Sequence, residues 1–163
     1  MSFDGRAIAN YVLDVSQESG RSVTHLGLQK LVYFCHAWSL AKLGKPLIKH
    51  QFEAWQFGPV LQYLYRDFKE FDRNPITTRA RRLNPQTGHT EIVQCTLDWE
   101  TDALLRKVIG FYGRLSAGTL VELSHSEGGP WDLVWNHEGK VNPGMKIDDS
   151  VIQGYFASVS SPF

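Results

Sequence analysis

The sequence has few of the features that mark secreted or membrane-spanning proteins. Only two cysteines occur among 163 residues, which is too few for a disulfide framework. No apolar run reaches the length of about 18 residues that a spanning helix needs. The first ten residues show no basic region followed by an apolar stretch, so we expect no signal peptide, no membrane association and a cytoplasmic location.

The chain also has no net charge, because 17 basic side chains balance 17 acidic ones. A neutral chain gives no electrostatic indication of a nucleic-acid partner. The chain is 42% hydrophobic, which is enough for one core without disulfide or metal support. We therefore expect residues 1–163 to form a single domain.

The spacings of metal sites and catalytic pairs are absent as well. Cys35 and His36 are adjacent, and neighbours on a helix point about 100° apart, so we interpret Cys35 as a buried hydrophobic residue. Ser124 and Ser126 flank His125 without the Gly-x-Ser-x-Gly frame of a hydrolase. Glu53 is a single carboxylate without an identifiable partner, which favours a structural hydrogen-bond acceptor. The expectation is a protein that is not an enzyme, with no catalytic residue, no metal and no cofactor.

What the sequence contains is a strong helical pattern. Apolar residues at helical spacing, with capping residues and glycine or proline stops, predict a mainly α, compact helical domain. The predicted helices cover residues 3–18, 24–44, 59–71, 98–113 and 116–124, with shorter ones after Pro130 and after the cap Asp148. The helix at 24–44 is apolar nearly all round, which predicts a central position.

Two details of this pattern concern proline and β-prone residues. Pro59 suits the first position of a helix, since its φ is already helical and its missing N–H costs nothing there. Residues 76–97 contain two β-prone runs around the turn-rich segment 84–88. This arrangement predicts a β-hairpin insertion that leans on the helices.

Arg79, Arg81 and Arg82 form the densest basic cluster and lie on the predicted hairpin. They could contact a partner protein, bind nucleic acid or simply keep an exposed strand soluble. Carboxylates interleave with the other basic residues nearby, which argues against nucleic acid. We select these three arginines as candidate partner-binding residues, with the other two interpretations left open.

Several motifs together resemble the Panacea domain family. They are Leu26-Gly-Leu-Gln-Lys-Leu-Val-Tyr-Phe34, Phe52-Glu-Ala-Trp-Gln-Phe-Gly-Pro-Val60, and Leu123-Ser-His125 followed by Pro130-Trp131. The family includes SocA-like antitoxins and GepA-like phage-associated proteins. The resemblance implies a cognate toxin that is neutralised by direct binding and, in the SocA-like branch, delivered to a protease. The alternative is a nucleic-acid-binding or uncharacterised enzymatic domain of phage or mobile-element origin.

The motif residues that we select have no obvious catalytic use. They are Leu28, Lys30, Leu31, Tyr33, Glu53, Trp55, Gly58, Pro59, His125 and Trp131. We interpret them as residues that specify the fold, with an ion pair between Lys30 and Glu53 joining two segments. In the same interpretation His125 is a hydrogen-bonded imidazole and Trp131 a buried aromatic plug. Ser124 stands where the family usually has threonine, and it keeps the hydroxyl.

The absence of metal spacings gives a first testable prediction. The purified chain should contain no stoichiometric metal and should keep its thermal midpoint after treatment with a chelator. Elemental analysis measures this directly. One zinc per chain would show that histidines and cysteines distant in the sequence converge on a site.

Overall fold

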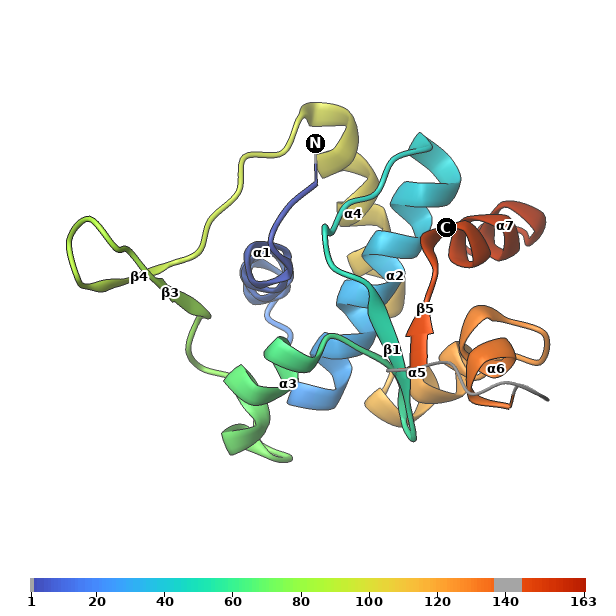
Figure 1. Cartoon of the computed structure of the whole chain (residues 1–163), viewed down its shortest axis with the longest axis horizontal. Helices are drawn as coiled ribbons and strands as arrows, with labels where there is room; N and C mark the ends of the chain where they lie inside the picture. The colour runs from blue at the N-terminus through green and yellow to red at the C-terminus, as the bar shows by residue number, and fades with distance from the viewer. Residues whose placement is uncertain (1, 137–144) are drawn as a thin grey trace.

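The computed structural model describes residues 2–136 and 145–163 and shows a mainly helical domain (Figure 1). The helices are α1 (Gly5–Glu18), α2 (His25–Leu43), α3 (Gln62–Phe68), the 3-10 helix η1 (Lys69–Phe71), α4 (Trp99–Tyr112), α5 (Ala117–Ser124), α6 (Pro130–Trp135) and α7 (Asp149–Ser158). The strands are β1 (Phe52–Trp55), β2 (Gly58–Val60), β3 (Arg81–Leu83), β4 (Thr90–Ile92) and β5 (Lys146–Ile147). The predicted fold class is confirmed.

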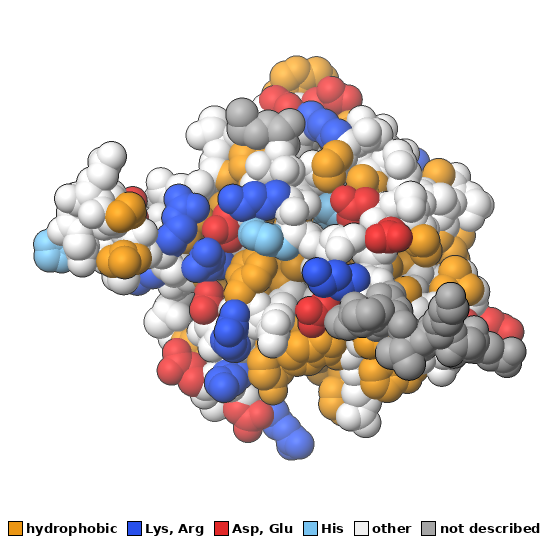
Figure 2. All heavy atoms as spheres, in the orientation of Figure 1, with side chains coloured by type: hydrophobic (Ala, Val, Ile, Leu, Met, Phe, Trp, Pro, Cys, Tyr) orange, Lys and Arg blue, Asp and Glu red, His pale blue; other side chains and the backbone are white. Residues whose placement is uncertain are grey.

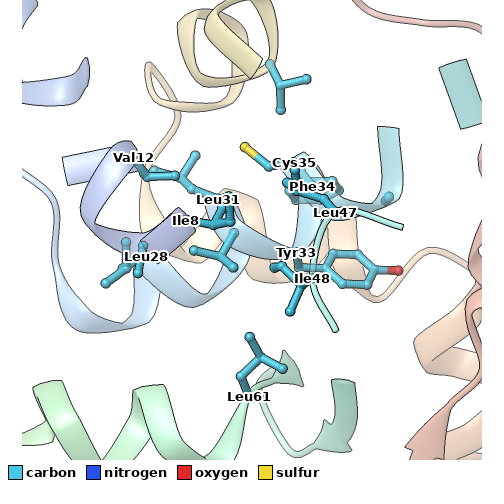
Figure 3. Packing of buried hydrophobic residues seen from close by; sticks show 14 of the residues in the cluster. Ile8, Val12, Leu28, Leu31, Tyr33, Phe34, Cys35, Leu47, Ile48 and Leu61 are labelled. Carbon is cyan, nitrogen blue, oxygen red and sulfur yellow. The ribbon is translucent and has the colours of Figure 1, made fainter. Parts of the chain in front are cut away.

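Helix α2 is the centre of the fold, as its apolar circumference predicts. Every residue from 27 to 40 is buried, and α1, α4 and α7 pack around this helix (Figure 1). The Thr24 hydroxyl caps the helix by accepting the Gly27 N–H at 3.2 Å. Gly44 ends it with a φ of 67°, a conformation in which glycine is favoured. Figure 3 shows Leu31 packed close to Ile8 and Val12 of α1.

A small antiparallel sheet, in the order β2-β1-β5, lies against α2. This sheet corrects the predicted helix at 59–71, because Pro59 lies in β2 opposite Ala54 and the helix begins only at Gln62. Proline is tolerated in an edge strand such as β2. The burial of all three β2 residues outweighs the local preference of Gly58-Pro59 for a helix start.

The predicted β-hairpin at 76–97 is confirmed, with β3 paired to β4. All residues of both strands are exposed, and the hairpin projects from the body of the molecule (Figure 1). Its base is fixed by Asn10 of α1. The Asn10 amide donates to the carbonyls of Ala80 and Val93 at 3.0 and 2.9 Å and accepts the Ala80 N–H at 2.8 Å.

The last helix, α7, begins after Asp148 as predicted, but the Asp148 side chain does not cap it. Its carboxylate accepts the amide of Gln51 at 2.8 Å instead. Ile147 and Ile152 on either side of Asp148 are both fully buried. Burial of these two side chains in the core therefore fixes the start of this helix more than the cap does.

Replacing Leu31 by alanine should destabilise the protein by about 2 to 5 kcal/mol, through lost burial and a residual cavity. Leu31 is only 3% exposed, at the centre of the core. Denaturant titration measures the loss. Leu133→Ala, at an exposed position of α6, is the matched control and should leave the unfolding midpoint nearly unchanged. Equal midpoints for both variants would show that α2 is not the core.

Candidate functional site

Six of the ten selected motif residues converge between α2, the β1–β2 hairpin and helices α5 and α6. We call them the motif cluster: Lys30, Trp55, Gly58, Pro59, His125 and Trp131. Three others, Leu28, Leu31 and Tyr33, lie in the hydrophobic core. Glu53 is the tenth. Its side chain shares the outward face of β1 with that of Trp55, whereas Trp55 joins the cluster through its backbone carbonyl.

Lys30 is the most unusual member of the cluster because its side chain is fully buried. Its ammonium group donates to the carbonyl oxygen of Pro59 at 2.7 Å, and it has no carboxylate partner among the described residues. Burial without a counter-charge lowers the pKa of Lys30 to about 7. The side chain thus bonds the edge strand β2 to the central helix.

Gln29 makes the neighbouring bonds, although it is not among the residues selected from the sequence. Its side-chain amide donates to the Leu61 carbonyl at 3.2 Å and accepts the Leu61 N–H at 3.0 Å. These backbone groups lie between β2 and α3, where no strand pairs with them. Because unpaired buried backbone groups are costly, Gln29 and Lys30 together complete the hydrogen bonding of this edge.

Gly58 makes the close approach of strand and helix possible. Its φ is +107°, and a Cβ atom at this position would lie 2.5 Å from Ser124 Oγ and 2.7 Å from Lys30 Cε. Any side chain here would push α5 and Lys30 away from β2. Glycine is therefore required both by the backbone conformation and by the space.

His125 and Trp131 close the other side of the cluster. The indole of Trp131 donates to the Trp55 carbonyl at 2.7 Å, and its ring stacks on His125 with centroids 3.6 Å apart. Trp131 is the predicted buried plug. The predicted hydrogen bond of the imidazole is wrong for one ring nitrogen, because the buried His125 Nε2 has no partner among the described residues. Burial and the charge of Lys30 lower the pKa of His125, which favours the neutral ring.

The ion pair predicted between Lys30 and Glu53 does not form. Glu53 instead accepts the indole N–H of Trp55 at 3.0 Å. The cause is the alternation of the strand: Phe52 and Ala54 face the core, so Glu53 and Trp55 are turned away from it. Sequence spacing alone does not tell which face of a short strand a residue occupies.

The nucleophilic side chains that the sequence offers, Ser124 and Cys35, are engaged or buried within the fold. Ser124 donates its hydroxyl to the Val121 carbonyl at 2.7 Å, and burial raises the pKa of the Cys35 thiol. Among residues 2–136 and 145–163 no group of three His, Cys, Asp or Glu side chains could hold a metal ion. In the same ranges no helix has the length and apolarity to cross a membrane.

The three arginines selected as partner-binding residues have different environments. Arg79 is held on α1, where it bonds Asp14 at 2.8 Å and Gln17 at 2.8 Å. Arg81 and Arg82 lie on β3 and are exposed. The guanidinium of Arg82 is 3.6 Å from the carboxylate of Asp4. Only the latter two are available on the projecting part of the hairpin.

Fold and site together define a small helical domain in which buried polar side chains of a central helix hold a β-hairpin. Residues 28–132 match the family described as Antitoxin SocA-like, Panacea domain. The chain is also 39% identical to the antitoxin SocA of Caulobacter vibrioides (strain NA1000 / CB15N), over 99% of this chain and 88% of that protein. No solved structure matches the chain significantly. The chain belongs to the SocA-like family with a Panacea domain.

The lowered pKa of Lys30 predicts a pH-dependent stability. At pH values between the folded pKa of about 7 and the ordinary value of 10.5, the Lys30 side chain is protonated in the unfolded chain and neutral in the folded chain. The free energy of unfolding should therefore increase with pH, on the order of 1 kcal/mol from about pH 7 to about pH 8. Chemical denaturation at a series of pH values measures this increase.

Lys30→Met is the control for this prediction, because methionine keeps much of the side-chain volume and cannot titrate. The increase should disappear in that variant. If both proteins show the same pH dependence, the proton is released by another group and Lys30 is charged in the folded state.

Proposed function

We propose that this chain is the antitoxin of a toxin–antitoxin pair and that it neutralises its cognate toxin by direct, non-catalytic protein binding. The membership in the SocA-like family carries this proposal. The engagement of the motif residues in bonds within the fold supports it, since Lys30, Gly58 and Trp131 serve packing between elements. We propose these motif residues as scaffold and a different surface as the toxin contact.

We call residues 81–92, the two strands β3 and β4 with their turn, the hairpin tip. The hairpin tip is the surface that we propose for toxin contact. Leu83 is 59% exposed and Ile92 also lies largely open, and both side chains share one face of the hairpin with Arg81. Figure 2 shows hydrophobic side chains on this projection and Lys and Arg side chains near the place where it joins the body. Arginine is enriched in protein interfaces, and the fully buried core of an interface is more apolar than the remaining surface.

The anchoring of the hairpin base supports the same assignment. Asn10 and Arg79 tie the base to α1, so the tip is presented from a fixed support. A preorganised surface loses less conformational entropy on binding than a flexible loop. Residues at the tip contribute little to the core, which lets them vary with the partner.

Variants at two hairpin positions test the proposal. Arg81→Glu with Arg82→Gln should weaken binding of the cognate toxin at least about tenfold if the two side chains meet an acidic surface. The thermal midpoint should change little, because exposed ion pairs contribute under about 1 kcal/mol. Glutamine is chosen at position 82 because a carboxylate there would face Asp4.

The matched control is Lys69→Glu with Arg73→Gln, which changes the same charge at exposed positions outside the hairpin. It should leave toxin binding intact. The candidate toxin is the product of the adjacent reading frame, identified by growth arrest when it is expressed alone. Unchanged toxin binding by the hairpin variant would reject the hairpin as contact surface. Salt-sensitive binding of duplex DNA that is lost in the hairpin variant, with toxin binding retained, would favour the nucleic-acid alternative.

Direct binding can act by blocking the toxin or, as the family resemblance implies, by delivering it to a protease. The half-life of the toxin in cells with and without this chain distinguishes the two modes. A shortened half-life supports delivery. An unchanged half-life with full protection from growth arrest supports blocking.

A further inference from the structure

A second candidate surface lies where the end of α2 meets the start of α4. A groove of about 330 Å³ opens there, within the size range of small binding pockets. Leu43 of α2, Leu104 of α4 and Phe163 near the end of the chain provide apolar lining. The groove does not include any residue of the motif cluster or the β3–β4 hairpin.

Trp99 forms part of the groove wall and is 83% exposed. The helix does not need tryptophan here, because Asp98 is the cap, bonded to the Thr101 N–H at 2.7 Å. The buried face of α4 begins with Thr101 and Leu105 and excludes Trp99. Tryptophan is enriched among the residues that dominate binding energies. In Figure 2 hydrophobic surface stands out at the top of the molecule, where α4 begins in Figure 1.

The rim of the groove is positively charged. Lys42 and Lys107 are exposed on the two helices that border it, and neither has a carboxylate partner among the described residues. The Lys42 ammonium lies 5.6 Å from the ring of Trp38. Glu100 is the acidic residue of the lining, and it lies in the first turn of α4, where the helix dipole already stabilises negative charge. Two ammonium groups thus remain for an external carboxylate.

We propose that this groove docks a short segment of a partner protein in which a bulky apolar side chain is flanked by aspartate or glutamate. The apolar side chain lies against Trp99 and Leu104, and the flanking carboxylates meet Lys42 and Lys107. This site is independent of the toxin contact proposed above. It makes the chain a protein with two separate binding surfaces, one on the hairpin and one at the start of α4.

The charge of the rim also argues against a second copy of this chain as the occupant. In a symmetric dimer the same patch meets itself. The lining has Lys42 and Lys107 against the one carboxylate of Glu100, so two copies would bring together patches of the same net charge. Like charges that meet in an interface are costly, so a partner with the opposite charge fits better.

Nuclear magnetic resonance with three synthetic peptides tests the proposal on the full chain. The first peptide is Gly-Asp-Glu-Leu-Phe-Asp-Glu-Gly. The second replaces its acidic residues by lysine and arginine, and the third replaces Leu-Phe by Ser-Gly. We expect the first to shift the amide signals of Leu43, Ala103 and Leu104 with a Kd on the order of 0.1 to 1 mM, and the others to bind at least about tenfold more weakly.

Two variants make the test specific. Trp99→Ala should abolish the shifts without changing the thermal midpoint, because the ring is exposed. Lys42→Glu with Lys107→Glu should reverse the preference, so that the basic peptide binds and the acidic one does not. Nonspecific binding to an apolar surface would not produce this reversal of the charge preference.

Four results would overturn the proposal. Two are the absence of shifts with the first peptide and equal shifts with the acidic and the basic peptide. The third is a concentration-dependent dimer in sedimentation that Trp99→Ala removes, which would identify a second copy as the occupant. The fourth is tighter binding of a single-stranded oligonucleotide than of the acidic peptide at the same amide signals, which would identify a nucleic-acid site. The toxin-binding assay is separate, so failure here leaves the hairpin assignment unaffected.

Discussion

The structure depends on polar side chains that are buried inside a helix-centred core. Helix α2 has no solvent-facing side from residue 27 to residue 40, so its polar residues must find partners within the protein. Gln29 and Lys30 find them in the backbone of β2 and of the segment that follows it. The same bonds complete the open edge of the small sheet. Helix α2 and the β1–β2 hairpin therefore provide hydrogen-bond partners for each other's buried polar groups.

A similar device holds the second hairpin. Asn10 on α1 bonds the backbone at the base of the β3–β4 hairpin, while the strands beyond it are exposed. The base thus belongs to the fold and the tip is free to meet a partner. Because of this division, the side chains of the motif cluster can form bonds within the fold while the proposed contact surfaces lie elsewhere. The residues that carry the family resemblance are thus separate from the residues proposed as partner contacts.

Sequence reasoning predicted the helices well where apolar periodicity and caps coincide, as for α1, α2 and α4. It failed at Gly58-Pro59, since a helix start and an edge strand share this local signal and burial against α2 decides between them. It also paired Lys30 with Glu53, although the alternation of β1 turns Glu53 away from the core. Gln29 and Asn10 were missed because their partners are backbone groups that lie 32 to 83 residues away. Backbone groups leave no signal in side-chain composition.

The motif cluster is proposed as scaffold and the hairpin tip as the toxin contact. Amide hydrogen exchange of the free chain and of its complex with the cognate toxin tests both parts together. We expect new protection in residues 81–92 on binding. We also expect the Leu61 amide to exchange slowly and equally in both states, because the Gln29 side chain accepts its hydrogen. Protection that appears instead in residues 55–59 and 124–131, with residues 81–92 unchanged, would show that the toxin binds at the motif cluster.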